Sequence, residues 1–202
     1  MKISVIGAGS WGTALSLVLH SNKHTVKCWT IDRETIKDVK NSAENTRYLP
    51  GIKIPEEIMI TDDIKEAAHD ADIVLNSVPS QVVRQVVPQV CKALECKDKI
   101  WVSVAKGIEN TTHLRISEVI HQVADIPVEK VVVLSGPSHA EEVARNIPTA
   151  VVSSCPNLES ATEIQHLFMT PYFRIYANTD IIGVELGGAL KNIVALAAGI
   201  CD

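Results

Sequence analysis

The sequence predicts an α/β fold in which a doubly wound, mostly parallel sheet carries helices on both faces. Short apolar runs alternate with helix-like segments along most of the 202 residues, which is typical of parallel strands joined by crossover helices. A glycine-rich segment directly follows the first apolar run, near the N-terminus. Hydrophobic residues make up 46% of the chain and aromatic residues only 4%, so we expect a sizeable aliphatic core.

The elements follow from local pattern. Strands are predicted where short runs of Val, Ile and Leu occur, at residues 2–7, 24–30, 57–61, 72–78, 99–104, 130–135, 149–154 and 172–177. Helices are predicted between them, at residues 11–21, 32–42, 62–69, 79–94, 112–124 and 157–169. Asp32 is suited to cap the second of these helices, and Leu49-Pro50-Gly51 is predicted to be a turn.

The segment at residues 181–200 breaks the alternation. It is a single long helical pattern, rich in Gly, Ala, Leu, Ile and Val and almost without charge, so it is predicted to be buried on most sides. We place a domain boundary near residues 178–181. The sequence reaches Asp202 just past this helix, so we expect either that another chain covers the helix or that the sequence is a fragment.

Composition excludes several classes of protein. The net charge of −5 argues against a nucleic-acid binder, which usually has a basic excess. No signal peptide is recognisable, and no uninterrupted apolar stretch approaches the roughly 18 residues of a membrane span. The five cysteines include no CxxC pair, so we expect five reduced thiols in a cytoplasmic protein, and the histidines do not supply metal-ligand spacing.

A dinucleotide site is predicted at residues 7–12. Gly7, Gly9 and Gly12 form the pattern GxGxxG between a strand and a helix, the context that the pattern requires. In such a loop the first glycine permits the tight turn, the second lets the backbone approach a pyrophosphate, and the third lets helix and strand pack closely. The helix N-terminus then offers unpaired N–H groups to the phosphates.

The end of the second strand carries signals for both nicotinamide cofactors. Asp32 lies 20 residues after Gly12, the distance of an acidic residue that accepts the ribose 2′-hydroxyl of NAD. It is equally well placed as a helix cap, and Arg33 beside it suits the 2′-phosphate of NADP. We expect tolerance of NAD and NADP, with Arg33 over the adenosine ribose.

Lys191 is a candidate proton-transfer residue. Oxidation of an alcohol needs a base, and the reverse reaction needs an acid at the carbonyl oxygen. A lysine serves both roles if its pKa falls toward neutrality, which desolvation and a second cation favour. Lys191 enters an apolar helix one turn after Gly187 and Gly188, and Lys106 is a candidate for the second cation.

Six motifs in order give a family resemblance. They are GAGSWGTAL (7–15), RYLPG (47–51), VPSQ (78–81), AKGIE (105–109), SGPSHAEEV (135–143) and ELGGALKN (185–192). Together they resemble the N-terminal part of the bacterial NAD(P)-dependent glycerol-3-phosphate dehydrogenases, over essentially the whole chain. The resemblance implies a Rossmann-like domain at residues 1–178 and, at residues 179–202, the start of a helical substrate-binding domain.

The resemblance also implies residue roles. The reaction is hydride transfer between NAD(P)H and dihydroxyacetone phosphate or sn-glycerol 3-phosphate, whose product supplies phospholipid synthesis. Lys191 is then the general acid/base and Lys106 contacts cofactor and substrate. The implied cofactor contacts are Ser10, Trp11, Arg33, Tyr48 and Ala140, and the implied substrate contacts are Gly136 and Ser138. Asn192, from its position next to Lys191, is a candidate donor to the same substrate region. His139 is interpreted as a structural or rim residue.

Two alternatives remain open. A β-hydroxyacid dehydrogenase has a similar N-terminus and a similar Gly-Gly and Lys-Asn helix, although residues 105–109 and 135–142 disfavour it. A nucleotide-binding module without turnover is the second alternative. In the family, a later acidic residue and an Arg-Asn pair hold the substrate phosphate, so we expect these 202 residues alone to turn over poorly. A homodimer is left open.

Overall fold

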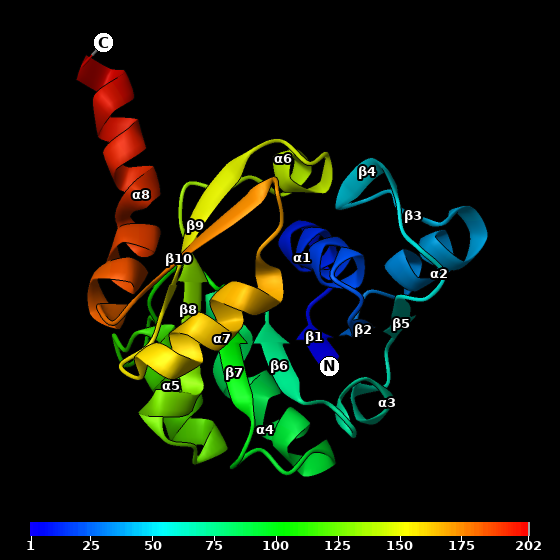
Figure 1. Cartoon of the computed structure of the whole chain (residues 1–202), viewed down its shortest axis with the longest axis horizontal. Coiled ribbons are helices and arrows are strands. Elements are labelled where there is room, and N and C mark those ends of the chain that lie inside the picture. The colour runs from blue at the N-terminus through cyan, green and yellow to red at the C-terminus, as the bar shows by residue number, and fades with distance from the viewer. Residues whose placement is uncertain (202) are drawn as a thin grey trace.

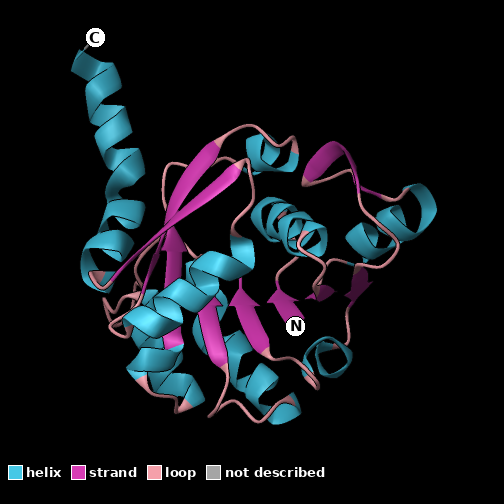
Figure 2. Ribbon diagram, in the orientation of Figure 1, coloured by secondary structure: helices cyan, strands magenta, loops and turns pink. Residues whose placement is uncertain are grey.

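The computed structural model describes residues 1–201. An eight-stranded sheet forms its centre, in the order β10-β9-β8-β7-β6-β1-β2-β5, with helices on both sides (Figures 1 and 2). Neighbouring strands are parallel except β8 and β9, which are antiparallel, so the predicted fold class is confirmed. The strands are β1 (Lys2–Ile6), β2 (Thr25–Trp29), β5 (Met59–Thr61), β6 (Ile73–Asn76), β7 (Ile100–Ser103), β8 (Val131–Ser135), β9 (Thr149–Ser154) and β10 (Phe173–Asn178).

Two aliphatic clusters hold the helices on the sheet, because alternate strand residues point to opposite faces. On one face Ile3 and Val5 of β1 join Leu15, and on the other Ile6 joins Val87 and Ile120. The first face carries α1 (Ser10–Ser21), α6 (Ala140–Ala144) and α7 (Leu158–Phe168), and the second carries α3 (Ile64–Ala68), α4 (Val83–Ala93) and α5 (Ile116–Ala124). Helix α2 (Arg33–Ser42) lies beside the edge strand β5 (Figure 1).

The chain reverses its direction across the sheet between β1 and β6. Strand β1 pairs with β2 on one side and with β6 on the other. Ligands of open α/β sheets bind at such a switch point, outside the carboxyl ends of the strands. The topology therefore places the glycine-rich loop after β1 at the position where a ligand is expected.

Three predicted segments differ from the structure. The predicted turn at residues 49–51 is wrong, because these residues belong to β4 (Leu49–Lys53), which pairs with β3 (Glu44–Asn45) as a separate hairpin. The predicted helix at 112–124 begins only at Ile116, because Arg115 bridges to Ile108. The predicted helix at 79–94 is a 3-10 turn, η1 (Ser80–Val82), followed by α4.

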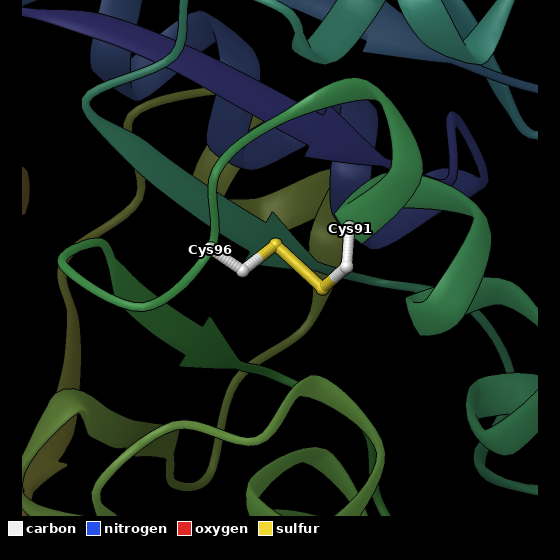
Figure 3. The surroundings of a disulfide bond; sticks show 2 residues. All are labelled: Cys91 and Cys96. Carbon is white, nitrogen blue, oxygen red and sulfur yellow. A yellow bond between two sulfur atoms is a disulfide. The ribbon is translucent and has the colours of Figure 1, made fainter.

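Two of the five cysteines form a disulfide, so the prediction of five reduced thiols is wrong for this pair. Cys91, near the end of α4, is bonded to Cys96 in the loop that follows (Figure 3). Their Cα atoms lie 5.5 Å apart, within the range that a disulfide spans. The remaining cysteines, Cys28, Cys155 and Cys201, are free thiols.

The last helix, α8 (Ile181–Cys201), extends away from the sheet (Figure 1). Only Ile181 and Glu185 are buried among its residues, so the prediction of burial on most sides is wrong for this chain. Low charge made the helix fit for burial, but little of the described chain packs against it. By length and composition alone α8 could cross a membrane, which is a weak indication because core helices of soluble proteins share these properties.

Candidate active site

A cavity of about 870 Å³ lies at the carboxyl ends of the central strands. This volume is within the usual range for small-molecule and cofactor sites. The glycine loop, the ends of β2, β6 and β7, the turn between β3 and β4, η1 with α4, and the start of α6 contribute its walls. They supply Gly7–Trp11, Trp29–Asp32, Tyr48, Ser77–Ser80, Val82, Gln85, Val86, Gln89, Val104–Lys106 and Ser138–Ala140.

The three glycines of the loop have different environments, and each environment gives a different reason for a glycine at that position. Gly7 has a φ of +111°, which favours glycine, and a Cβ there would lie 2.8 Å from the Ser77 carbonyl oxygen. A Cβ on Gly12 would collide with the Gly7 carbonyl oxygen. A Cβ on Gly9, in contrast, would meet no atom of residues 1–201 within 4 Å beyond its chain neighbours. Packing therefore accounts for Gly7 and Gly12, whereas Gly9 faces open space.

That open space is a cradle for an anion. Gly9 is the N-cap residue of α1, and no described side chain caps its amides there. The first N–H groups of a helix lack partners within the helix, and its dipole favours negative charge. Ser10 and Trp11 line the cavity at this point. The residues present thus fit the pyrophosphate of a dinucleotide.

The far end of the cavity is charged. Asp32 caps α2 by accepting from the backbone N–H of Glu34 at 3.1 Å, and it also pairs with Arg47 at 2.9 Å. Partial desolvation of the carboxylate is outweighed by hydrogen bonds from Tyr48 and the start of α2, so the pKa of Asp32 lies below its usual value. Arg33 points elsewhere, with its Nε 3.0 Å from Asp62 Oδ2.

Lys106 reaches the cavity from the loop after β7, and two contacts hold that loop. The buried Glu109 accepts two hydrogen bonds from the guanidinium of Arg84, at 2.8 Å each. Gln81 donates to the Ile108 carbonyl at 2.8 Å and accepts from the Asn110 N–H at 3.0 Å. The bond from Gln81 to Ile108 joins the VPSQ and AKGIE motifs directly.

Lys191, on α8, lies near Lys106 but outside the lining of the cavity. Burial first, and then the positive charge of Lys191, lowers the pKa of Lys106. The start of α8 is anchored by Glu185, whose carboxylate pairs with Arg115 at 2.7 Å and accepts from the Ser117 N–H at 2.9 Å. The structure thus brings together the two lysines that the sequence suggested as a pair.

The other predicted site residues fall into two groups. Gly7, Gly9, Ser10, Trp11, Tyr48, Lys106, Ser138 and Ala140 line the cavity, as does His139. Gly12, Arg33, Gly136, Lys191 and Asn192 lie outside its lining. A Cβ on Gly136 would lie 2.9 Å from the Cα of Val151, so packing against β9 already accounts for this glycine.

Three anchoring residues were missed by sequence reasoning. Asn45 is fully buried and donates to the Ala8 carbonyl and to Thr13 Oγ1, both at 2.9 Å. Glu109 and Glu185 were quoted inside motifs but given no role. The signal that could have found Glu109 and Glu185 is an acidic residue inside a motif that consists mainly of apolar residues and glycine.

Among residues 1–201, no group of three or more His, Cys, Asp or Glu side chains is arranged to hold a metal ion.

The fold and the cavity define a dinucleotide-binding protein of the Rossmann type, with a lysine pair beside the nucleotide cradle. The family model "NAD-dependent glycerol-3-phosphate dehydrogenase N-terminus" matches residues 2–161, and its C-terminal counterpart matches residues 180–202. The chain belongs to the NAD-dependent glycerol-3-phosphate dehydrogenase family, rather than to the β-hydroxyacid dehydrogenases.

Relatives agree with this assignment. The chain is 50% identical to glycerol-3-phosphate dehydrogenase [NAD(P)+] of Bacillus cereus (strain AH187) and of Bacillus anthracis (strain A0248), over its full length. It covers 59% of these relatives. The crystal structure of the Coxiella burnetii glycerol-3-phosphate dehydrogenase is 34% identical with a TM-score of 0.89, covering 98% of this chain and 60% of that one. The Plasmodium falciparum structure is 30% identical with a TM-score of 0.89, covering 100% and 59%.

Proposed function

We propose that this chain carries the cofactor site and the proton-transfer residues of an NAD(P)-dependent glycerol-3-phosphate dehydrogenase. The observation that carries the proposal is the meeting of an open glycine cradle and the pair Lys106–Lys191 at one edge of the sheet. The substrate pair is dihydroxyacetone phosphate and sn-glycerol 3-phosphate, and the product serves phospholipid synthesis in the cytoplasm. The relatives' names support this reading.

The proposed chemistry divides between cofactor and protein. A bound nicotinamide supplies or accepts the hydride. Lys191 delivers a proton to the carbonyl oxygen during reduction and removes it during oxidation. Lys106, whose pKa is lowered by burial and by Lys191, lies beside that oxygen and the nicotinamide. Two lysines together place positive charge where alkoxide character develops.

The remaining site residues are assigned as follows. Gly7, Gly9, Ser10, Trp11 and Ala140 hold the nucleotide, and Gly12 supports the loop that carries them by its close packing against Gly7. Tyr48 lies at the adenosine end, with Arg33 near it but turned to Asp62, and Gly136, Ser138 and Asn192 lie near the substrate. We also propose that residues 179–202 begin a helical substrate-binding domain. A homodimer is a further proposal that gel filtration tests.

The test follows NADH absorbance on addition of dihydroxyacetone phosphate. It compares the 202-residue chain with a chimaera in which the remaining part of the Bacillus cereus relative is joined after Asp202. We expect the chimaera to turn over, and Lys191→Met in the chimaera to lose roughly 10²–10⁴-fold of that rate. The 202-residue chain should bind NADH and turn over far more slowly.

Matched controls make the result specific. Lys37→Met removes an exposed lysine paired with Glu34 on α2 and should leave the rate unchanged. Near-normal turnover by Lys191→Met would remove this lysine from the mechanism. Failure of the 202-residue chain to bind NADH would contradict the assigned cofactor site itself.

A further inference from the structure

A second arginine, Arg47, lies beside the adenosine end of the cavity, just outside its lining, and sequence reasoning left it without a role. In a Rossmann-type site the pyrophosphate lies at the N-terminus of α1 and the adenosine ribose at the end of β2. Here that end is formed by Thr30, Ile31 and Asp32, with Tyr48 facing them. A 2′ substituent of the ribose therefore comes close to Asp32, if the proposed function holds.

The two arginines nearby are held differently. Neither arginine is part of the cavity lining. Arg33 is paired with Asp62, and its side chain is 81% exposed. Arg47 has its Nη1 2.9 Å from Asp32 Oδ2. Its guanidinium carbon lies 5.2 Å from the centre of the Tyr48 ring. Both of Arg47's partners line the cavity, whereas the partner of Arg33 does not.

The β3–β4 hairpin fixes Arg47 relative to the nucleotide cradle. Asn45, two residues earlier, donates to the Ala8 carbonyl inside the glycine loop. Its Oδ1 accepts from the Tyr48 N–H at 3.3 Å. The segment that carries Arg47 is therefore bound to the loop that would hold the pyrophosphate, so its distance from the adenosine ribose is set by the fold.

We propose that Arg47 is the specificity-determining residue for NADP against NAD, and that it acts through a choice of partner. With NAD, the Asp32 carboxylate accepts a hydrogen bond from the ribose 2′-hydroxyl and keeps its ion pair with Arg47. With a 2′-phosphate, the Arg47 guanidinium turns to the phosphate and offsets the charge of Asp32. The Arg47 side chain is 62% exposed and that of Asp32 15%, so the arginine has room to turn. The loss of this partly screened pair is offset by an arginine–phosphate contact, which is charge-assisted and fork-shaped.

Direct binding tests this proposal without any turnover. The 202-residue chain is titrated with NADH and NADPH by nucleotide fluorescence, and with 5′-AMP and 2′,5′-ADP by calorimetry. Arg47→Ala should weaken NADPH and 2′,5′-ADP roughly 10- to 100-fold. It should change the affinities for NADH and 5′-AMP by less than about threefold. Asp32→Asn, which keeps a good helix cap, should shift the preference toward NADPH.

A matched variant on the same hairpin controls for general charge effects. Lys53 pairs with Glu44 and lies outside the nucleotide cavity, so Lys53→Ala should leave the NADPH to NADH ratio unchanged. Equal losses for both cofactors in Arg47→Ala would overturn the inference, as would a change of ratio in Arg33→Ala that Arg47→Ala does not show. Loss of NADH binding by the unmodified chain would overturn the proposed function as well, so the two failures are distinguishable.

Discussion

Apolar side chains are mostly buried in the sheet domain and mostly exposed on helix α8. In the sheet domain, apolar side chains such as Leu15 and Val102 are fully buried between helices and strands. On α8, Leu196 is 68% exposed, and Ile193, Val194 and Ile200 are exposed with it. The sheet domain buries its apolar residues against its own helices and strands, whereas α8 leaves most of its apolar residues exposed. The difference teaches that α8 is held by a polar anchor at its first turns rather than by its apolar face.

Removing that anchor should give the largest effect. Glu185→Ala removes the buried partner of Arg115, which keeps its pair with Glu118 at 2.8 Å, so we expect a loss near the lower end of the range for a broken buried pair, about 3 kcal/mol. We expect this loss in the free energy of detaching α8 from the sheet domain, because the core does not depend on Glu185. Hydrogen exchange of the α8 amides measures it. Glu141→Ala, whose partner Arg145 is 3.8 Å away and exposed, is the control and should change little. Unchanged protection in Glu185→Ala would show that α8 is held by its apolar residues after all.

Paired leucine truncations test the comparison directly. Leu15→Ala in α1 removes a fully buried side chain and should cost about 2–5 kcal/mol. Leu196→Ala on α8 should change the free energy of unfolding by no more than about 0.5 kcal/mol. Urea denaturation of both variants gives the two values. A large loss in Leu196→Ala would mean that this face is covered in solution.

The two regions also differ in how well sequence predicted them. The alternating strands and the glycine loop were predicted because their signals are local, and Asp32 was correctly interpreted as a helix cap. The β3–β4 hairpin was missed because β3 has only two residues, and Leu49-Pro50-Gly51 has the composition of a turn. The Cys91–Cys96 bond was missed because its spacing, which joins a helix end to the next loop, is not that of CxxC.

Burial of α8 was mispredicted for a different reason. Composition tells whether a helix is fit for burial, but exposure depends on what packs against it. The site shows the same limit. Lys106, Tyr48 and Ser138 line the cavity as expected, and their specific roles remain predictions. The partner of each arginine, Asp62 or Asp32, depends on a hairpin that the sequence did not reveal.

The glycine loop gives a test within the well-packed region. Gly9→Val adds a side chain in open space, so we expect the fold to keep its stability and NADH affinity to fall at least about tenfold, or ~1.4 kcal/mol. Gly12→Val adds one against the Gly7 carbonyl and should lower the stability itself. Fluorescence titration and thermal denaturation separate the two. The pyrophosphate assignment is wrong if Gly9→Val binds NADH as tightly as the unmodified chain.

The smallest expected effect on stability is at Asp70, in the loop between α3 and β6, and this effect depends on pH. Asp70 accepts a hydrogen bond from Lys27 at 2.7 Å and pairs with Lys2 at 3.2 Å, so it joins the middle of β2 to the start of β1. The hydrogen bond from Lys27, opposed by desolvation and aided by Lys2, lowers the pKa of Asp70 to about 2. A carboxylate with a lowered pKa in the folded state stabilises the protein above its unfolded pKa, and this contribution is lost as pH falls from about 4 to about 2.

We therefore expect Asp70→Asn to cost about 1 kcal/mol at pH 7, a value reduced for screening because the Asp70 side chain is 29% exposed. Denaturant titrations at several pH values should show most of this difference lost by pH 2, where the native carboxyl is half protonated, and the remainder disappearing below that pH. Asp125→Asn makes the same change in charge at an exposed pair with Lys97 and should have no measurable cost at any pH. If Asp70→Asn were as costly at pH 2 as at pH 7, the loss would come from packing of the side chain and not from its charge, and this part of the sheet would be held like the rest of the domain.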